Sequence, residues 1–461
     1  MTKQVALGWL WLLLVAGITV IYRGVTQSAT IDESYVYHLF LNQDASALWS
    51  KYDAGYHVLH TWATWLAVHK FGKSEPILRL PSMLAGLCFL WGVGVLCRKV
   101  MGDGWRFVVA VVLLTAHPLV ADYLSVARGY GAGLAFFTWA LIAYLSDRVV
   151  RGSVLLALST ACNLTFLVPS IALSLSLLAA RALRGTELWA PLKQMVLPFA
   201  VTLGPILAIP LWHAGRAHFY FGSNDWSEAF ASLLEPTTQY GERIPLQMAA
   251  ALNGTMAPLL LILILVAGLI AAKRCDLPAT LAVGCLTLSL AMLTAAHQVL
   301  GALYPWSRTG IYLLWTALLS CAFLWNWAAQ QSDWPKRFSV VFGAASTCLA
   351  LLFVVQADLR YYYDFRSDAG VAAMMSHLRD LHPTQPECIG GNWTFEPTVN
   401  YYRLRYKLGW LAEMKRTPEP QQGCRFYLVI GSDERYVALL HLRKLKVDAV
   451  SGTILAEAVT E

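Results

Sequence analysis

The chain has 461 residues, of which 57% are hydrophobic and only 14% are charged. About a quarter of the residues of a soluble globular protein are charged, so this composition excludes an ordinary water-soluble fold. The formal net charge of +7 lies largely in short loops between apolar runs, which indicates orientation in a membrane and argues against a nucleic-acid partner.

Eleven apolar runs predict a polytopic α-helical membrane protein with about eleven transmembrane helices. A helix needs about 20 apolar residues to cross a bilayer, and the runs 107–120, 153–163 and 165–180 are clearly shorter than that. The first run is not followed by a small-residue cleavage site, so we expect it to be retained as a helix. The runs cover residues 5–22, 77–97, 107–120, 129–146, 153–163, 165–180, 194–212, 255–272, 278–295, 310–329 and 338–357.

Basic residues mark every second connection between these runs, and the positive-inside rule places such connections in the cytoplasm. We therefore expect a cytoplasmic N-terminus in a bacterial inner membrane. The stretch 152–181 has basic residues on both flanks and is short, which predicts a squat helical hairpin. The extracytoplasmic side then receives residues 23–76, 122–128, 213–254, 297–309 and everything after 356.

The composition changes after residue 357, where charge rises and prolines and glycines interrupt the chain. We expect 1–357 to form the membrane domain, with its first extracytoplasmic loop at 23–76, and 358–461 to form a small periplasmic α/β domain. Cys388 and Cys424 are either free or, in an oxidising compartment, paired. The pattern predicts helices at 368–381, 397–405 and 434–444 and strands near 388–390, 426–430 and 453–456.

An acidic pair, Asp32-Glu33, lies ten residues after the end of the first apolar run. A carboxylate near a membrane surface is able to act as a general base, because partial burial raises its pKa and a neighbouring cation lowers it again. Acidic residues are also common in solvated turns and at the N-caps of helices. The spacing alone leaves both interpretations open.

Four further motifs accompany the acidic pair. Residues 72–75 (Gly-Lys-Ser-Glu) and 79–82 (Arg-Leu-Pro-Ser) lead into the second run, 127–130 (Ala-Arg-Gly-Tyr) precede the fourth, and 304–308 (Tyr-Pro-Trp-Ser-Arg) precede a late run. Together with the acidic pair, these motifs resemble the GT-C glycosyltransferases of the protein mannosyltransferase and aminoarabinose transferase type. The resemblance covers roughly the first 190 residues by motif and the rest of the chain by layout.

This resemblance implies a GT-C fold and the transfer of a sugar from a polyprenyl-phosphate carrier to an extracytoplasmic acceptor, with inversion at the anomeric carbon. The acceptor would be a glycolipid, a glycan or a protein, and membrane lipids would surround the enzyme. Asp32 is the expected base, and Glu33 would orient the acceptor or a cation. Asp122 matches the second acidic position of the broader fold.

The resemblance also assigns residues to the carrier. A lipid-phosphate leaving group requires nearby cations, and a guanidinium group binds phosphate oxygens bidentately. Arginines at helix ends also snorkel to lipid headgroups, and the histidines fit interfacial packing equally well. The candidates are Arg128, Arg308, Lys51 and Arg79 for the phosphate, and His57, His60, Tyr130 and Tyr304 for the acceptor or lipid site.

Two other classes of protein are compatible with many apolar helices. A multi-pass lipid or glycan transporter or flippase usually places ionisable residues near the midplane of the membrane, whereas these charges gather in loops. A catalytically inactive scaffold would use its C-terminal domain to bind a partner. We expect no cofactor, and although related oligosaccharide-transferring enzymes use a divalent ion, no ligand spacing here favours an essential metal.

Overall fold

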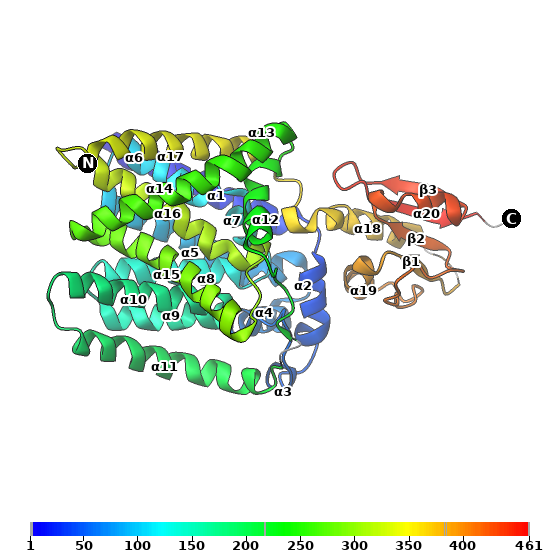
Figure 1. Cartoon of the computed structure of the whole chain (residues 1–461). Coiled ribbons are helices and arrows are strands. Elements are labelled where there is room, and N and C mark those ends of the chain that lie inside the picture. The colour runs from blue at the N-terminus through cyan, green and yellow to red at the C-terminus, as the bar shows by residue number, and fades with distance from the viewer. Residues whose placement is uncertain (1–2, 216–217, 382, 384, 460–461) are drawn as a thin grey trace. The chain divides into compact units, whose positions relative to one another are not determined.

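The computed structural model describes residues 3–215, 218–381, 383 and 385–459. The chain divides into two compact units that interleave along the sequence. The helical unit comprises Met1–Val20, Ser50–His60 and Ser82–Asp358, and the mixed unit comprises Ile21–Trp49, Thr61–Pro81 and Leu359–Glu461. Figure 1 shows the bundle of long helices and the small sheet that distinguish the two units.

Every one of the eleven predicted apolar runs overlaps a helix of the structure. The protein is therefore a polytopic α-helical membrane protein, as its composition predicts. The helices are α1 (Lys3–Thr26), α5 (Glu75–Met101), α6 (Trp105–Thr115), α8 (Tyr130–Tyr144), α9 (Val149–Cys162), α10 (Leu167–Leu183), α11 (Trp189–Trp212), α14 (Ala257–Lys273), α15 (Leu277–Leu300), α16 (Ile311–Ala329) and α17 (Lys336–Gln356).

Length separates these helices into groups. Among the described residues, seven helices are long and apolar enough to cross a membrane, or eight if the bent pair Leu10–Thr26 and Ile31–Leu41, with an angle of 63°, counts as one span. The other three, α6, α8 and α9, are shorter apolar helices of 11 to 15 residues. The expected hairpin at 152–181 forms from α9 and α10, with the short η2 (Leu164–Phe166) at its turn.

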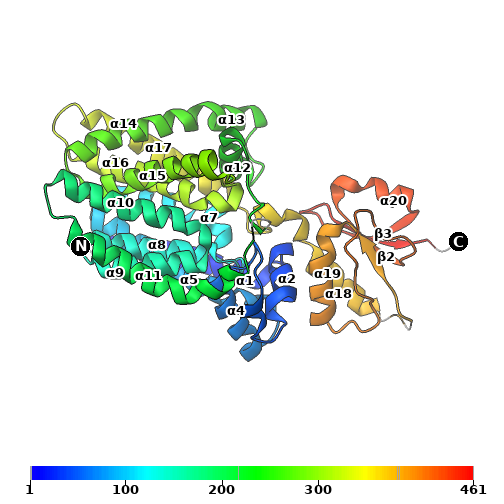
Figure 2. The ribbon, with the colours of Figure 1, turned by 60° about the horizontal axis from the view of Figure 1, so that its bottom comes forward.

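Helix α16 forms the centre of the helical unit, because 94% of its most apolar window is buried. It packs against α15 and α17, and α15 packs in turn against α10 and α14. Helices α9, α10 and α11 run side by side (Figures 1 and 2). Shorter elements connect the long helices: α3 (Ala47–Ser50), α4 (Val58–Phe71), α7 (Pro118–Tyr123), α12 (Trp226–Gln239), α13 (Leu246–Ala251), η4 (Leu252–Met256) and η5 (Ser307–Gly310).

A four-stranded sheet with the order β1-β2-β4-β3 organises the mixed unit. Strand β1 pairs parallel to β2, and the other two pairings are antiparallel. Cys388 and Cys424 form a disulfide beside the first pair. The elements are α2 (Ile31–Val36), η1 (Tyr37–Leu41), η6 (Tyr363–Asp368), α18 (Val371–Leu381), β1 (Ile389–Gly391), η7 (Trp393–Phe395), α19 (Glu396–Arg405), β2 (Phe426–Val429), η8 (Gly431–Asp433), α20 (Arg435–Leu439), β3 (Leu442–Val447) and β4 (Ile454–Ala458).

One predicted element of this unit is wrong. The helix expected at 434–444 ends as α20 at Leu439, and the chain continues as the edge strand β3. Only Leu442 of this strand is buried, and exposed Arg443 and Lys444 follow it directly, so no regular alternation marks a strand. Long basic side chains are compatible with either structure.

The mixed unit contains more than the C-terminal segment. Its boundary falls between Asp358 and Leu359, but 21–49 and 61–81 also belong to it, and α2 packs against α19. The acidic pair therefore lies in a compact unit with residues that follow it by more than 300 positions. The membrane sides assigned to 1–357 and 358–461 stay predictions.

Candidate active site

The acidic pair lies at the start of the short helix α2. Thr30 caps this helix, because its side chain accepts the Glu33 N–H at 3.2 Å while Glu33 accepts the Thr30 N–H at 2.9 Å. The capping residue is thus Thr30, and Asp32 is the second residue of the helix. Asp32 is half-buried, whereas Glu33 is only 2% exposed. The two neighbouring carboxylates therefore have different surroundings.

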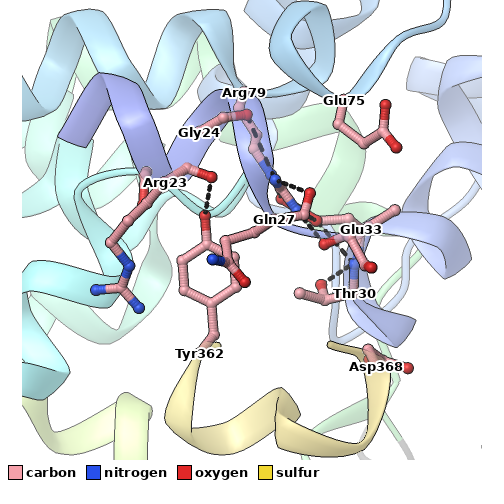
Figure 3. A network of polar contacts seen from close by, with 12 residues as sticks. Arg23, Gly24, Gln27, Thr30, Glu33, Glu75, Arg79, Tyr362 and Asp368 are labelled. Atoms are coloured by element: carbon pink, nitrogen blue, oxygen red, sulfur yellow. Dashed lines mark hydrogen bonds and ion pairs between the residues drawn. The ribbon is translucent and has the colours of Figure 1, made fainter. Parts of the chain in front are cut away.

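Glu33 forms a buried ion pair with Arg79 at the start of α5 (Figure 3). Arg79 is 0% exposed and donates to both oxygens of Glu33, at 2.8 and 2.6 Å. It also donates to the carbonyl oxygens of Gln27 at 2.8 Å and Ser28 at 2.6 Å. A guanidinium group and a carboxylate tolerate burial when they pair bidentately and their remaining hydrogen bonds are made. Phosphate binding by Arg79 stays a prediction, and these contacts give it a structural role.

The same unit holds three polar residues that the sequence analysis missed. Asp368 is 3% exposed and accepts the N–H of Ile31 at 2.7 Å. Burial, together with the charges of Asp32 and Glu33, raises the pKa of Asp368 to about 8. Tyr402 and Glu75 are also buried, and the Tyr402 hydroxyl donates to Glu75 at 2.8 Å. Glu75 belongs to the Gly-Lys-Ser-Glu motif, but no local pattern marks Asp368 and Tyr402, because their partners are distant in sequence.

In the helical unit, Arg128 lies directly before α8 in the Ala-Arg-Gly-Tyr motif. Arg128 is 5% exposed and donates to the carbonyl oxygen of Gly55 at 3.3 Å. The next residue, Gly129, approaches another turn so closely that an added Cβ would lie 1.9 Å from the Cys162 carbonyl oxygen and 3.0 Å from the His57 Cβ. A side chain at this position would force the turn apart, so the motif requires glycine.

Arg308 comes from η5, at the start of α16. The N–H of Ser307 donates to the Ser232 hydroxyl at 2.8 Å, which fixes this turn to α12. The Arg308 guanidinium lies over the Phe221 ring at 4.5 Å from its centroid. Nearby in sequence, Tyr304 exchanges backbone hydrogen bonds with Ser223 at 2.8 and 3.0 Å. These contacts tie the late motif to the loop after α11.

His57 brings several predicted residues together. It is only 7% exposed. Burial lowers its pKa well below the usual value, and the charges of Arg128 and Arg308 also lower it. The imidazole is therefore neutral at physiological pH. Its ring packs edge-on against Tyr130 at 5.1 Å. We call His57, Arg128, Tyr130 and Arg308 the His57 cluster.

Two buried polar atoms close to this cluster have no hydrogen-bond partner in the part of the chain that the structure describes. They are Nε2 of His57 and Nδ2 of Asn163. Asn163 is 1% exposed, follows Cys162 at the close approach to Gly129, and uses its Oδ1 to accept the Thr165 N–H at 3.0 Å. Unsatisfied buried polar atoms are uncommon and often mark a ligand site. Asn163 was not predicted from the sequence, but a polar residue in the turn of an apolar hairpin is a signal that indicates such a site.

The remaining candidates occupy separate environments. Asp122 on α7 is 2% exposed and accepts the Tyr240 hydroxyl at 2.7 Å. His60 is hydrogen-bonded to Ser82 at 2.7 Å, which favours packing over ligand contact. Lys51 is half-buried in the connection after α3. Tyr304 stacks between the rings of Trp226 and His297 at 4.2 and 4.3 Å.

Metal ligands do not gather in the described ranges, where no group of three or more His, Cys, Asp and Glu residues is placed to hold a metal ion. Positive charge near the His57 cluster comes from arginine side chains. The cluster is therefore suited to bind an anion, and a carboxylate such as Asp32 or Asp122 is suited to accept a proton.

Comparisons with known proteins return glycosyltransferases. No protein-family model matches the sequence, and no curated protein matches it significantly. Among solved structures, ArnT from Cupriavidus metallidurans bound to undecaprenyl phosphate is 14% identical, with 98% of each chain covered and a TM-score of 0.47. The Archaeoglobus fulgidus oligosaccharyltransferase, in complex with Zn and sulfate, is 13% identical, with 93% of this chain and 69% of that chain covered and a TM-score of 0.44.

A third similar structure is the arabinosyltransferase EmbB from Mycobacterium smegmatis, at 12% identity, with 85% of this chain and 42% of that chain covered and a TM-score of 0.32. The proteins found are GT-C glycosyltransferases, the class that the sequence motifs resemble. At these identities and TM-scores, the likenesses do not assign the chain to a family.

Proposed function

We propose that the protein is an integral-membrane glycosyltransferase that transfers a sugar from a polyprenyl-phosphate carrier to an extracytoplasmic acceptor. The observation that carries this proposal is the buried, neutral His57, which packs beside Tyr130 and the Arg128-Gly129 turn and whose pKa the charges of Arg128 and Arg308 also lower. The two arginines lie 180 residues apart in the sequence. Two guanidinium groups around a neutral hydrogen-bonding ring suit the phosphate of a lipid-linked sugar donor.

Arg128 and Arg308 would stabilise the phosphate as it leaves. Negative charge develops on the bridging oxygen when the bond to the sugar breaks, and preorganised cations in a low-dielectric site stabilise that charge strongly. His57 would add a neutral hydrogen bond through Nε2. Lys51 and Tyr130 are further candidates for the carrier and acceptor, as are His60 and Tyr304 with their existing packing contacts.

Asp32 would act as the base. In this reaction the acceptor oxygen forms a bond to the anomeric carbon, and the bond from that carbon to the phosphate oxygen breaks with its electron pair leaving on the phosphate. The acceptor proton goes to Asp32. Attack from the face opposite the leaving phosphate inverts the anomeric carbon. Asp122, held by Tyr240, would be a second carboxylate for the acceptor or sugar.

The surroundings of the reaction follow from the charge pattern. We place the protein in a bacterial inner membrane, with a cytoplasmic N-terminus and with residues 358–461 in the periplasm. The acceptor would then be a glycolipid, a glycan or a protein on that side. The positive charge of the two arginines would take the place of a divalent ion.

The test is transfer by the purified protein in lipid nanodiscs. A panel of undecaprenyl-phosphate hexoses and pentoses, labelled in the sugar, is incubated with a membrane extract as acceptor source, and release of the carrier is measured. We expect at least one donor to be consumed, and Asp32→Asn to abolish its consumption while remaining folded. Movement of the intact donor across the bilayer without release of the carrier would instead support a flippase.

A control variant tests whether losing a positive charge outside the His57 cluster affects the reaction. Arg151 on α9 is exposed, and Arg151→Ala removes one positive charge without touching the His57 cluster. Consumption of the donor should therefore stay at the wild-type rate. An unimpaired Asp32→Asn variant would contradict the base assignment.

A further inference from the structure

The turn that carries Asp32 is held by the C-terminal part of the same unit. Residues 28–31 precede or begin α2, and two of their backbone N–H groups donate to side chains located far along the sequence. Ile31 donates to Asp368 at 2.7 Å and Ala29 donates to the Tyr402 hydroxyl at 2.8 Å. These partners are separated from the turn by 337 and 373 residues.

Ser28 extends this attachment. Its hydroxyl donates to the Ala369 carbonyl at 2.7 Å and accepts the Ala372 N–H at 3.2 Å. On the other side, Arg79 donates to the Ser28 carbonyl at 2.6 Å. Figure 3 shows Arg79 directed toward Glu33. Thr30 and Asp368 lie near the start of α2, the helix that carries Glu33. Each residue of 28–31 is therefore held by a hydrogen bond to a side chain.

We propose that Asp368 and Tyr402 are positioning residues for the base, so that the C-terminal segment completes the site that presents Asp32. This inference rests on the proposed role of Asp32. It assigns to 359–461 a part in the reaction that is independent of any contact with the acceptor.

The physical need for such positioning comes from the length of α2. A helix of six residues is not stable by itself, since nucleating a helix fixes several residues for few hydrogen bonds. The capping box satisfies its first turn, but Ile31 would lose its partner without Asp368. A base displaced by about 1 Å can cost on the order of 10²-fold in rate.

The state of Asp368 suits this role. With its pKa raised to about 8, the carboxyl group is largely protonated at neutral pH and adds little repulsion beside Asp32. Among the groups facing it, Asp32 and Glu33 are acidic, and Arg79 neutralises Glu33. An amide has the same shape as a neutral carboxyl group and can still accept the Ile31 N–H. Asp368→Asn is therefore the conservative variant, and Asp368→Ala removes the acceptor.

The experiment measures two quantities on full-length protein in nanodiscs. Hydrogen exchange is followed in peptides covering 28–36, and kcat and KM are measured with the undecaprenyl-phosphate sugar that the wild type consumes. We expect Asp368→Ala to exchange faster in this peptide and to lose about 10²-fold in kcat, with KM for the carrier within twofold of wild type. Asp368→Asn should restore kcat to within threefold.

Two further variants complete the design. Tyr402→Phe removes one hydroxyl and should lower kcat about tenfold if Asp368→Ala does not fold. Asp380→Asn, which changes an exposed carboxylate on α18, should match wild type. Wild-type kcat in Asp368→Ala or Tyr402→Phe, in a system where Asp32→Asn is inactive, overturns this inference alone. An equal loss in Asp368→Asn and Asp368→Ala also overturns it, and an active Asp32→Asn removes the proposed base itself.

Discussion

Two buried sites of this protein, one in each unit, differ in how their polar groups are paired. In the mixed unit, Arg79 is 0% exposed and its guanidinium donates to both oxygens of Glu33 and to backbone carbonyls. In the helical unit, Arg128 and Arg308 lie near His57, and Nε2 of that ring has no partner among the described residues. The Arg79–Glu33 pair is satisfied within the protein, whereas the His57 ring keeps one nitrogen without a partner among the described residues.

This difference teaches how to separate structural from functional arginines in a membrane enzyme. All three arginines come from motifs at helix starts, and the sequence predicts phosphate binding for each of them. Burying a charge is costly unless it is paired, and a satisfied pair has little left to offer a ligand. We therefore expect the arginines near the unsatisfied His57 ring, and not Arg79, to bind the phosphate.

The largest expected effect is on the satisfied pair. Arg79→Leu leaves the Glu33 carboxylate buried without its partner, which should cost about 3–5 kcal/mol and prevent stable accumulation in the membrane. The double variant Glu33→Leu/Arg79→Leu removes both charges and should recover part of that loss. Thermal unfolding in detergent, with retention of monodisperse protein, measures both.

An exposed ion pair is the matched control for this prediction. Arg379 and Asp380 pair on the surface of α18, and Arg379→Leu should change stability by no more than about 1 kcal/mol. A folded Arg79→Leu variant that fails only to bind undecaprenyl phosphate would break the comparison, because Arg79 would then be a phosphate ligand.

The second prediction concerns the two arginines of the His57 cluster. Arg128→Ala and Arg308→Ala should each lower kcat by about 10²–10³-fold, the range seen when one preorganised donor is removed from a transition state. We expect their unfolding temperatures to fall less than that of Arg79→Leu, whose partner Glu33 is fully buried. Carrier release and thermal unfolding on the same preparations make the contrast direct.

The sequence predicted the helical layout well and the site only in part. Hydrophobic runs marked every apolar helix, because lipid forces backbone polar groups to pair within a helix. The acidic pair and Arg128 stood out through motifs. Asp368 and Tyr402 could not be found, because they act through backbone groups more than 330 residues away. Arg79 was expected to bind phosphate like the other basic candidates, because its partner Glu33 lies 46 residues away and no local pattern indicates the ion pair.

Gly129 offers a smaller test of how the His57 cluster is built. Gly129→Ala would place a methyl group 1.9 Å from the Cys162 carbonyl oxygen, so the turn must move. We expect a loss of about 1–3 kcal/mol in stability, as in other overpacked positions, and a lower kcat because Arg128 moves with its neighbour. Gly102→Ala would not be a fair control, since Gly102 has a positive φ of 69°. Gly204→Ala on α11, where an added Cβ meets nothing, should be neutral.

The last prediction concerns the pH dependence of stability that Asp368 contributes. Its pKa is raised from 3.8 to about 8 in the folded protein, so the folded state holds this proton more tightly than the unfolded state. The contribution of the group is fully present below about pH 4 and is lost as pH rises toward 8. The wild-type unfolding temperature should therefore fall between pH 5 and pH 8.5 by several degrees more than that of Asp368→Asn, whose amide does not titrate. If the unfolding temperatures of the two proteins change equally with pH, Asp368 is ionised in the folded state. The mixed unit would then bury a carboxylate charge beside the satisfied Arg79–Glu33 pair.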